Sequence, residues 1–217
     1  MANIKCYGCS FTKHGGKHWP TWVDFVRLSA KQDKIVNLGE SGSSNEYICR
    51  TILMTAKKND TVIVMWSSFD RVHQEKLFQK TGINTGKCNP DDTGTTMEQL
   101  FHRSLEYIWL ANRYCNENKI KIINLNMTIF TIGETRQKNS FKEHLDVGYR
   151  HWPIDLSSFC LDHKPLVKIE RDTHPTPSQQ YKFAKSIVCP ILKIDTVDIQ
   201  EDKLFLLDNK AKAESDG

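Results

Sequence analysis

The sequence predicts an α/β fold in which a parallel sheet lies between two layers of helices. Short apolar runs alternate along the chain with longer segments whose apolar residues recur at helical spacing. One run, at residues 61–66, is almost entirely apolar, as expected for a strand that is covered on both faces of a parallel sheet. Small-residue turns follow the first two runs, and α/β folds place their ligands at such strand ends.

The predicted elements follow one another from the N-terminus. They are a strand at 4–9, a loop at 12–18, a helix from Pro20, a strand at 35–38, a helix opened by a capping box of Ser43 and Glu46, the strand at 61–66, a loop at 80–96, a helix opened by Thr95 and Glu98, and a strand at 120–125. Each helix carries an apolar stripe, so each should pack on the sheet.

The C-terminal part is less regular. Residues 127–171 show no clear period, and we expect a functional insertion or lid there. Thr176 and Pro177 fit the N-cap and first residue of a helix. We expect residues 191–199 to form a final strand or edge ribbon, which gives a sheet of about five strands. Residues 1–200 should be a single domain, and 201–217 a tail whose end, from 209, is disordered.

Composition narrows the class of protein. Of the 217 residues, 39% are hydrophobic and 26% are charged, which is typical of globular domains. No apolar run approaches the roughly 18 residues that cross a bilayer, and the first residues lack the features of a signal peptide. Seven irregularly spaced cysteines favour free thiols in a reducing compartment. We therefore expect a cytoplasmic protein without a membrane partner.

Charge and cysteine spacing argue against two further classes. The net charge of +4 comes from scattered lysines rather than from a basic stripe with aromatic residues, so no nucleic-acid partner is expected. Cys6 and Cys9 match C-x-x-C, but strand alternation should direct their sulfurs to opposite faces, which excludes a shared metal. We expect no metal and no cofactor.

Three residues carry the groups of nucleophilic acyl transfer. Ser10 ends the first strand, and Asp172 and His174 precede the last predicted helix. A serine hydroxyl needs a base within hydrogen-bond reach, and the base needs an acid that orients it. Two structural alternatives remain open: Ser10 bonding its own turn, and Asp172 capping a turn that merely starts a helix.

These segments resemble the conserved blocks of a known superfamily. Gly8-Cys9-Ser10-Phe11-Thr12, Asn37-Leu38-Gly39-Glu40-Ser41-Gly42 and Asp172-Thr173-His174-Pro175 are similar to the first, second and last blocks of the SGNH (GDSL-type) hydrolases, most closely to small divergent members encoded by tailed phages. The resemblance implies a flavodoxin-like three-layer α/β/α sandwich and metal-free hydrolysis of carboxylic esters. It implies Ser10 as nucleophile, His174 as base and Asp172 as its orienting acid, and it adds virion association as a possibility.

The resemblance also implies an oxyanion hole. Gly42 would donate its N–H, although this glycine could equally serve turn geometry alone. The third-block asparagine of the superfamily has no counterpart in Trp66-Ser67-Ser68-Phe69-Asp70, so Ser68 or Asn45 would have to replace it. Arg71 could clamp an anionic substrate or pair with Asp70 or a glutamate.

Other candidates for substrate contact are His14, His18 and Trp152. The leading hypothesis is an esterase or deacetylase that cleaves a small acyl ester, for example an O-acetyl group on a carbohydrate. An O-acyltransferase on the same residues is one alternative. A catalytically silent binding module or phage accessory or structural part is another, supported by the missing asparagine. A nucleotide-binding role is disfavoured because Gly39 and Gly42 lack the phosphate-binding pattern. The sequence does not specify the oligomeric state.

Overall fold

A computed structural model of the chain describes residues 3–13, 19–30, 34–72, 86–87, 95–127, 155–169, 172 and 174–216. In this part of the chain four parallel strands form the central sheet, in the order β2-β1-β3-β6. Their bounds are β1 Asn3–Gly8, β2 Lys34–Asn37, β3 Thr61–Trp66 and β6 Lys121–Asn126. The predicted fold class is confirmed.

The central strand β3 shows why the sheet is covered on both faces. Ile63 and Met65 belong to one apolar core, whereas Val62, Val64 and Trp66 belong to the other, since successive side chains of a strand point to opposite faces. All five side chains are fully buried. The continuous apolar run at 61–66 therefore indicates that helices cover both faces of the sheet rather than one.

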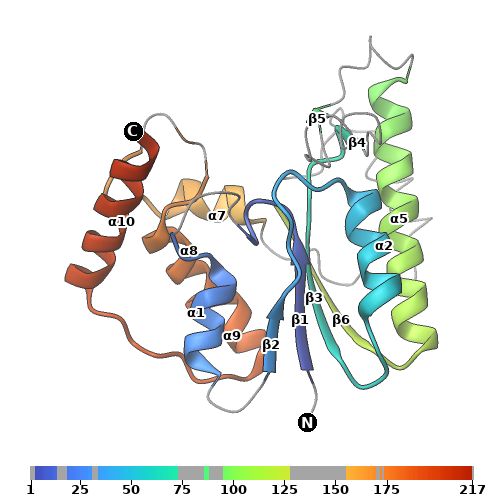
Figure 1. Ribbon diagram of the computed structural model, residues 1–217, viewed down its shortest axis with the longest axis horizontal. Helices are drawn as coiled ribbons and strands as arrows, with labels where there is room; N and C mark the ends of the chain where they lie inside the picture. The colour runs from blue at the N-terminus through green and yellow to red at the C-terminus, as the bar shows by residue number, and fades with distance from the viewer. Residues whose placement is uncertain are drawn as a thin grey trace.

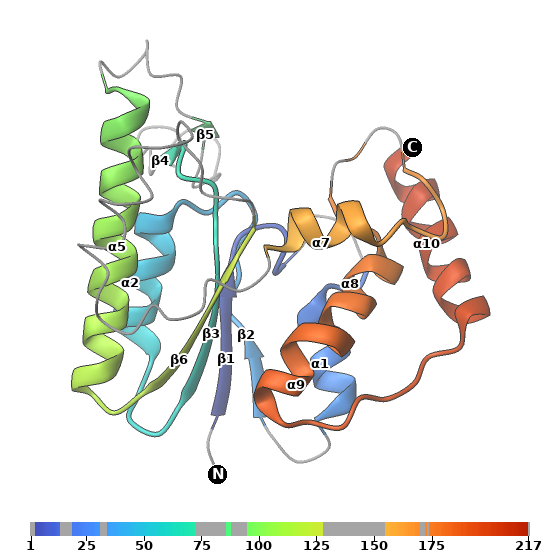
Figure 2. The ribbon, with the colours of Figure 1, turned by 180° about the vertical axis from the view of Figure 1, so that it is seen from behind.

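The helices divide between those two layers (Figures 1 and 2). On one face lie α2 (Asn45–Thr55) and α5 (Met97–Glu117), which pack on each other. On the other face lie α1 (Trp22–Ser29), α7 (Leu156–Asp162) and α8 (Pro177–Phe183), which continues through a π-helical turn, η1 (Ala184–Val188), into α9 (Cys189–Leu192). A final helix, α10 (Glu201–Asp216), packs outside α8.

Two of the predicted helix starts are shifted by one residue. Ser44, not Ser43, caps α2 by accepting a hydrogen bond from the N–H of Tyr47, and Ser43 instead bonds the carbonyl of Glu40. Thr96, not Thr95, caps α5 in a capping box with Gln99. Adjacent serines or threonines satisfy the same pattern, so the backbone decides which one is the cap.

The C-terminal predictions were wrong in two places. Residues 191–199 form no strand: α9 ends at Leu192, Lys193 adopts a left-handed conformation, and the following segment remains irregular up to α10. Residues 201–216 form a helix, where we expected a tail that is disordered from 209. Its buried residues are Leu204, Asp208 and Ala211, and because one is charged and one is small, the sequence shows little apolar periodicity there.

The predicted loops are described only in part. Within residues 80–96, Gly86–Lys87 form strand β5, which pairs antiparallel with β4 (Arg71–Val72). Within the predicted insertion 127–171, α7 is capped by Asp155, and residues 128–154 lie outside the described part. No helix among the described residues is long and apolar enough to cross a bilayer.

Candidate active site

The turn after β1 presents Ser10 at the carboxyl end of the sheet. The N–H groups of Thr12 and Lys13 both donate to the carbonyl of Cys9, which closes the turn. A Cβ at Gly8 would lie 2.1 Å from Thr12 Oγ1 and 2.9 Å from the carbonyl oxygen of Met65, so only glycine fits there. Ser10 is 4% exposed.

The segment after β2 is bonded to this turn. The side-chain amide of Asn37 donates to the carbonyl of Thr12 (2.8 Å) and accepts from the N–H of Gly39 (3.0 Å), and Glu40 N–H donates to the carbonyl of Gly8 (2.9 Å). A Cβ at Gly39 would lie 2.9 Å from Thr12 Cγ2. Asn37 and Gly39 thus hold the second block against the first, a role that we did not predict, although both lie within the block quoted above.

Ser10, His174 and Asp172 form one hydrogen-bonded chain. His174 Nε2 lies 2.8 Å from Ser10 Oγ, and Nδ1 lies 2.5 Å from Asp172 Oδ1. A carboxylate can only accept, so Nδ1 of the neutral ring carries the proton and Nε2 accepts from the Ser10 hydroxyl. The same oxygen of Asp172 also accepts the backbone N–H of His174 (2.9 Å), which fixes the ring relative to its own main chain.

Two further features fix the position of His174: a contact with its ring and the capped helix that follows it. The ring of Phe11 meets that of His174 edge-on, with 5.2 Å between ring centroids. Just after His174, helix α8 begins with a capping box in which Thr176 and Gln179 bond each other's backbone N–H groups. The side chains of His174 and Asp172 remain 25% and 11% exposed, so the site is open to small molecules.

Two backbone N–H groups that the sequence analysis relates to an oxyanion hole are those of Ser10 and Gly42. Within the described part of the chain, neither Ser10 N–H nor Gly42 N–H donates to a protein acceptor. Gly42 lies in a turn with φ +78°, a conformation that favours glycine. Its neighbour Ser43 N–H is bonded to the carbonyl of Glu40, and the turn leads directly into α2.

The side chain of Asn45 is hydrogen-bonded to the backbone of Ser67. Its side-chain oxygen accepts the N–H of Ser67 (2.8 Å), and its amide N–H donates to the carbonyl of Ser67 (3.0 Å), with the side chain 1% exposed. This pairing fastens the third-block loop to the start of α2. Ser67 Oγ is buried without a hydrogen-bond partner among the described residues, whereas Ser68 is partly exposed. Asn45, one of the two replacement donors considered above, therefore has a structural role in this loop.

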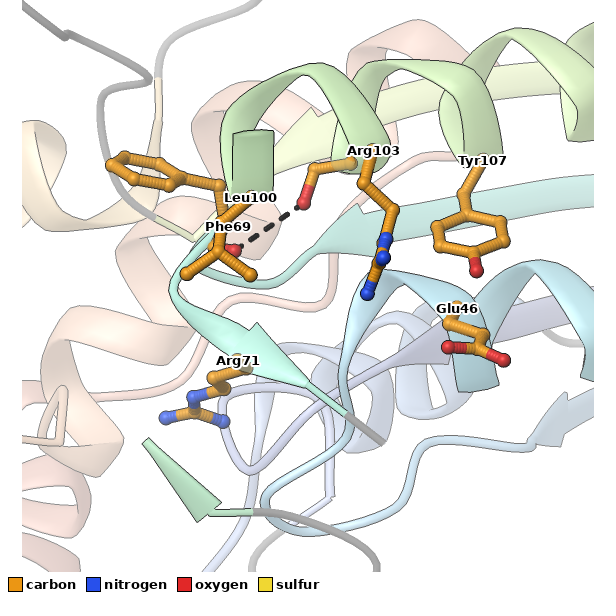
Figure 3. A pocket seen from close by; sticks show the side chains of 7 residues that line it. Glu46, Phe69, Arg71, Leu100, Arg103 and Tyr107 are labelled. Atoms are coloured by element: carbon orange, nitrogen blue, oxygen red, sulfur yellow. Dashed lines mark hydrogen bonds between the residues drawn. The ribbon is translucent and has the colours of Figure 1, made fainter. Parts of the chain in front are cut away.

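Arg71 lines a small pocket with residues of α2 and α5 (Figure 3). The other lining residues are Glu46, Phe69, Leu100, Arg103, Ser104 and Tyr107. Burial, and then the Glu46 carboxylate, raise the pKa of Tyr107. Arg71 forms no ion pair with any carboxylate in the described ranges, and its Nη1 is buried without a hydrogen-bond partner there. The predicted pairing with Asp70 is absent.

The described cysteines and acidic residues offer no metal site. No group of three or more His, Cys, Asp or Glu side chains is arranged to hold an ion in this part of the chain. Cys6 and Cys9 are free and lie in the same apolar core, contrary to the expected opposite faces, because β1 ends at Gly8 before Cys9. The Cys9 thiol donates to Met127 Sδ (3.2 Å). His14, His18 and Trp152 lie outside the described residues.

Comparison with solved structures places the fold among lipolytic proteins. The chain is similar to a member of the lipolytic G-D-S-L family from Veillonella parvula, with 16% identity over 87% of this chain and 99% of that one and a TM-score of 0.51. TesA is similar at 15% identity over 88% and 98%, with a TM-score of 0.54. The psychrotrophic esterase EstA from Pseudoalteromonas sp., in a structure inhibited by monoethylphosphonate, is similar at 13% identity over 89% and 98%, also with a TM-score of 0.54.

Comparison of the sequence itself found no matching family model and no match among curated proteins. The three structural likenesses each cover almost the whole of the other chain and most of this one. The protein therefore shares the fold of these G-D-S-L and esterase structures.

Proposed function

We propose that this protein is a serine-dependent carboxylic ester hydrolase. The observation that carries the proposal is the chain of hydrogen bonds from Ser10 Oγ through His174 to Asp172, assembled from groups 164 residues apart in sequence. The lipolytic and esterase activities named for the similar structures support the same chemistry. Neither a metal nor a cofactor is needed for it.

The geometry supports a two-step mechanism. His174 Nε2 takes the hydroxyl proton as Ser10 Oγ bonds to the acyl carbon; the protonated ring then gives that proton to the departing alcohol as the acyl–oxygen bond breaks. A water molecule next gives its proton to Nε2 and attacks the acyl-enzyme, and Ser10 recovers the proton as the acid leaves. Asp172 keeps the ring in the required tautomer and stabilises its charged form.

The N–H groups of Ser10 and Gly42 are our candidates for the oxyanion hole, because neither donates a hydrogen bond to a protein acceptor in the described structure. The hydroxyl of Ser68 is our first candidate for a third donor; Asn45 remains the second, since only one of its two amide N–H groups donates to Ser67. Losing one such donor costs about 10²–10³ in rate. We therefore expect a modest turnover number if Ser68 does not donate.

A small acyl ester is the substrate class that we propose, for example an O-acetyl group on a carbohydrate. Ser10 is 4% exposed, which favours a short acyl group over a long chain. Arg71, with a buried guanidinium nitrogen that has no partner among the described residues, could add affinity for an anionic substrate. Membership of the phage-encoded group and association with a virion stay predictions.

The test combines labelling with turnover. A fluorophosphonate should bond covalently to Ser10 with release of fluoride, and p-nitrophenyl acetate should be hydrolysed. Ser10→Ala and His174→Ala should each abolish both reactions, whereas the exposed controls Ser186→Ala and His102→Ala should retain them. Equal rates in His174→Ala and wild type would refute the proposal.

The alternatives give different outcomes in the same assay. A silent binding module would show neither labelling nor hydrolysis in the wild type. An O-acyltransferase would be labelled, but its acyl-enzyme would pass the acyl group to an added alcohol in preference to water. Product analysis with and without a sugar acceptor separates that activity from hydrolysis.

A further inference from the structure

The C-terminal helix α10 buries a carboxylate against the start of the helix that follows His174. Asp208 has 0% exposure, although it lies on the outermost helix of the protein (Figures 1 and 2). A buried carboxylate needs hydrogen bonds to replace its lost hydration. The hydrogen bonds to Asp208 are donated by Val167, Thr176 and Ser178.

Among the described residues, the hydrogen bonds to Asp208 come from two segments that flank the site residues Asp172 and His174. Ser178 donates its backbone N–H to Oδ1 (2.8 Å) and its hydroxyl to Oδ2 (2.7 Å), and the Thr176 hydroxyl donates to Oδ2 (3.2 Å). Val167 N–H also donates to Oδ2 (3.3 Å). One carboxylate thus joins the chain five residues before Asp172 to the chain two residues after His174.

Apolar contacts of α10 reach the serine side of the site as well. Ala211, one turn along the helix from Asp208, is fully buried in a small cluster with Trp19 and Ile169. Ile169 lies three residues before Asp172, and Trp19 lies between the Ser10 turn and helix α1. The small side chain of Ala211 lets the backbone of α10 approach both segments closely.

We propose that α10 is a clasp that aligns the catalytic residues, with Asp208 as a positioning residue for His174. Asp208 is a positioning residue because it bonds neither Ser10 nor His174; it binds Val167 on one side of the Asp172–His174 pair and Thr176 and Ser178 on the other. The hydrogen bond between His174 Nε2 and Ser10 Oγ depends on this placement. The inference rests on the proposed hydrolase function for its kinetic consequence, but not for its structural one.

The decisive variant is Asp208→Asn in the full chain. It preserves the shape of the side chain but replaces one acceptor oxygen with an NH₂ group, which cannot accept from Ser178 N–H if it takes the place of Oδ1 or from Val167 N–H if it takes the place of Oδ2. We expect kcat to fall about 10- to 100-fold with KM within about twofold, because displacement of a reacting group by about 1 Å costs on that order. The control is Asp202→Asn, an exposed carboxylate on the same helix, which should leave kcat unchanged.

A spectroscopic readout separates alignment from stability. The His174 Nδ1–H proton, hydrogen-bonded to Asp172, should give a low-field proton resonance, assigned by its loss in His174→Ala. We expect Asp208→Asn to shift or broaden this resonance at a temperature where circular dichroism shows the variant to be folded. An unchanged resonance and unchanged kcat, accompanied only by a lower melting temperature, would overturn the proposal.

Ser178→Ala provides a milder perturbation should Asp208→Asn not fold. It removes the 2.7 Å hydroxyl bond to Asp208 and leaves the backbone bonds in place. The same loss of kcat and change of resonance are expected, in smaller degree, and wild-type values for both would contradict the inference. If the wild type lacks esterase activity, the proposed function fails, whereas the resonance still tests the clasp.

Discussion

Gln180 of α8 provides the sharpest test of how the two halves of the site are held together. The side chain is 1% exposed; its oxygen accepts the N–H of Trp22, the first residue of α1 (3.0 Å), and its amide donates to the carbonyl of Phe11, next to Ser10 (3.4 Å). It therefore links the helix after His174 to the turn that carries Ser10.

The perturbation is Gln180→Met, which keeps the length of the side chain and removes both hydrogen bonds. Trp22 N–H would be left buried without an acceptor, at a cost of about 1–3 kcal/mol, and the weaker bond to Phe11 adds about 1 kcal/mol. We expect a total loss of about 2–4 kcal/mol in the free energy of unfolding. For a chain of 217 residues each kcal/mol lowers the melting temperature by about 2–4 °C, so the shift should be roughly 4–16 °C.

Thermal and urea unfolding, followed by circular dichroism, measure this change. The matched control is Gln200→Met, at an exposed position before α10, which should shift the melting temperature by less than about 2 °C. Because the Phe11 carbonyl lies beside Ser10, the rate of fluorophosphonate labelling should also fall in Gln180→Met. A variant that melts like the control and is labelled at the wild-type rate would refute the assigned role of Gln180.

Two further predictions follow from charged groups. Burial of Asp60 acts to raise its pKa, but the hydrogen bond and charge of Lys5, 2.7 Å away, together with Lys57 N–H, lower it below its usual value. A lowered folded-state pKa means that the stabilisation is complete above about pH 4, the unfolded value, and is lost as the pH falls through the folded value. Asp60→Asn should therefore lower the free energy of unfolding, measured with urea at pH 7, by about 3 kcal/mol, and this difference from wild type should shrink below about pH 4. A difference that stays constant with pH would exclude the Lys5–Asp60 pair as its source, as would an equal loss in the exposed control Asp195→Asn. Arg71→Gln should raise KM about 5- to 50-fold for an ester that carries a carboxylate, since charge-assisted hydrogen bonds contribute about 1–2 kcal/mol more than neutral ones. The same substitution should leave KM for p-nitrophenyl acetate within twofold. Equal effects on the two esters would argue against contact between Arg71 and the substrate carboxylate.

Much of the fold could be predicted from short-range features of the sequence. Apolar runs predicted all four strands of the described sheet, because a strand of a parallel sheet between two helical layers buries most of its side chains, and almost all of them in the central strand β3. The three helix starts predicted from capping residues were correct to within one residue, because a cap is a short-range bond between a side chain and a nearby N–H, whereas α1 begins two residues after the predicted Pro20. The proximity of Ser10 to His174 was also predicted, and the two side chains lie 2.8 Å apart.

What the sequence by itself determined was therefore the layered fold and the residues that carry the proposed chemistry. The tertiary structure alone decided how those residues are held: Asn45 turned to Ser67, Gln180 bonded to Phe11, and Asp208 buried in a helix that had looked like a disordered tail. The physical reason is that such bonds join polar groups between 22 and 169 residues apart, and polar residues at those separations leave no periodic pattern to read. Only folding reveals which donors face which acceptors.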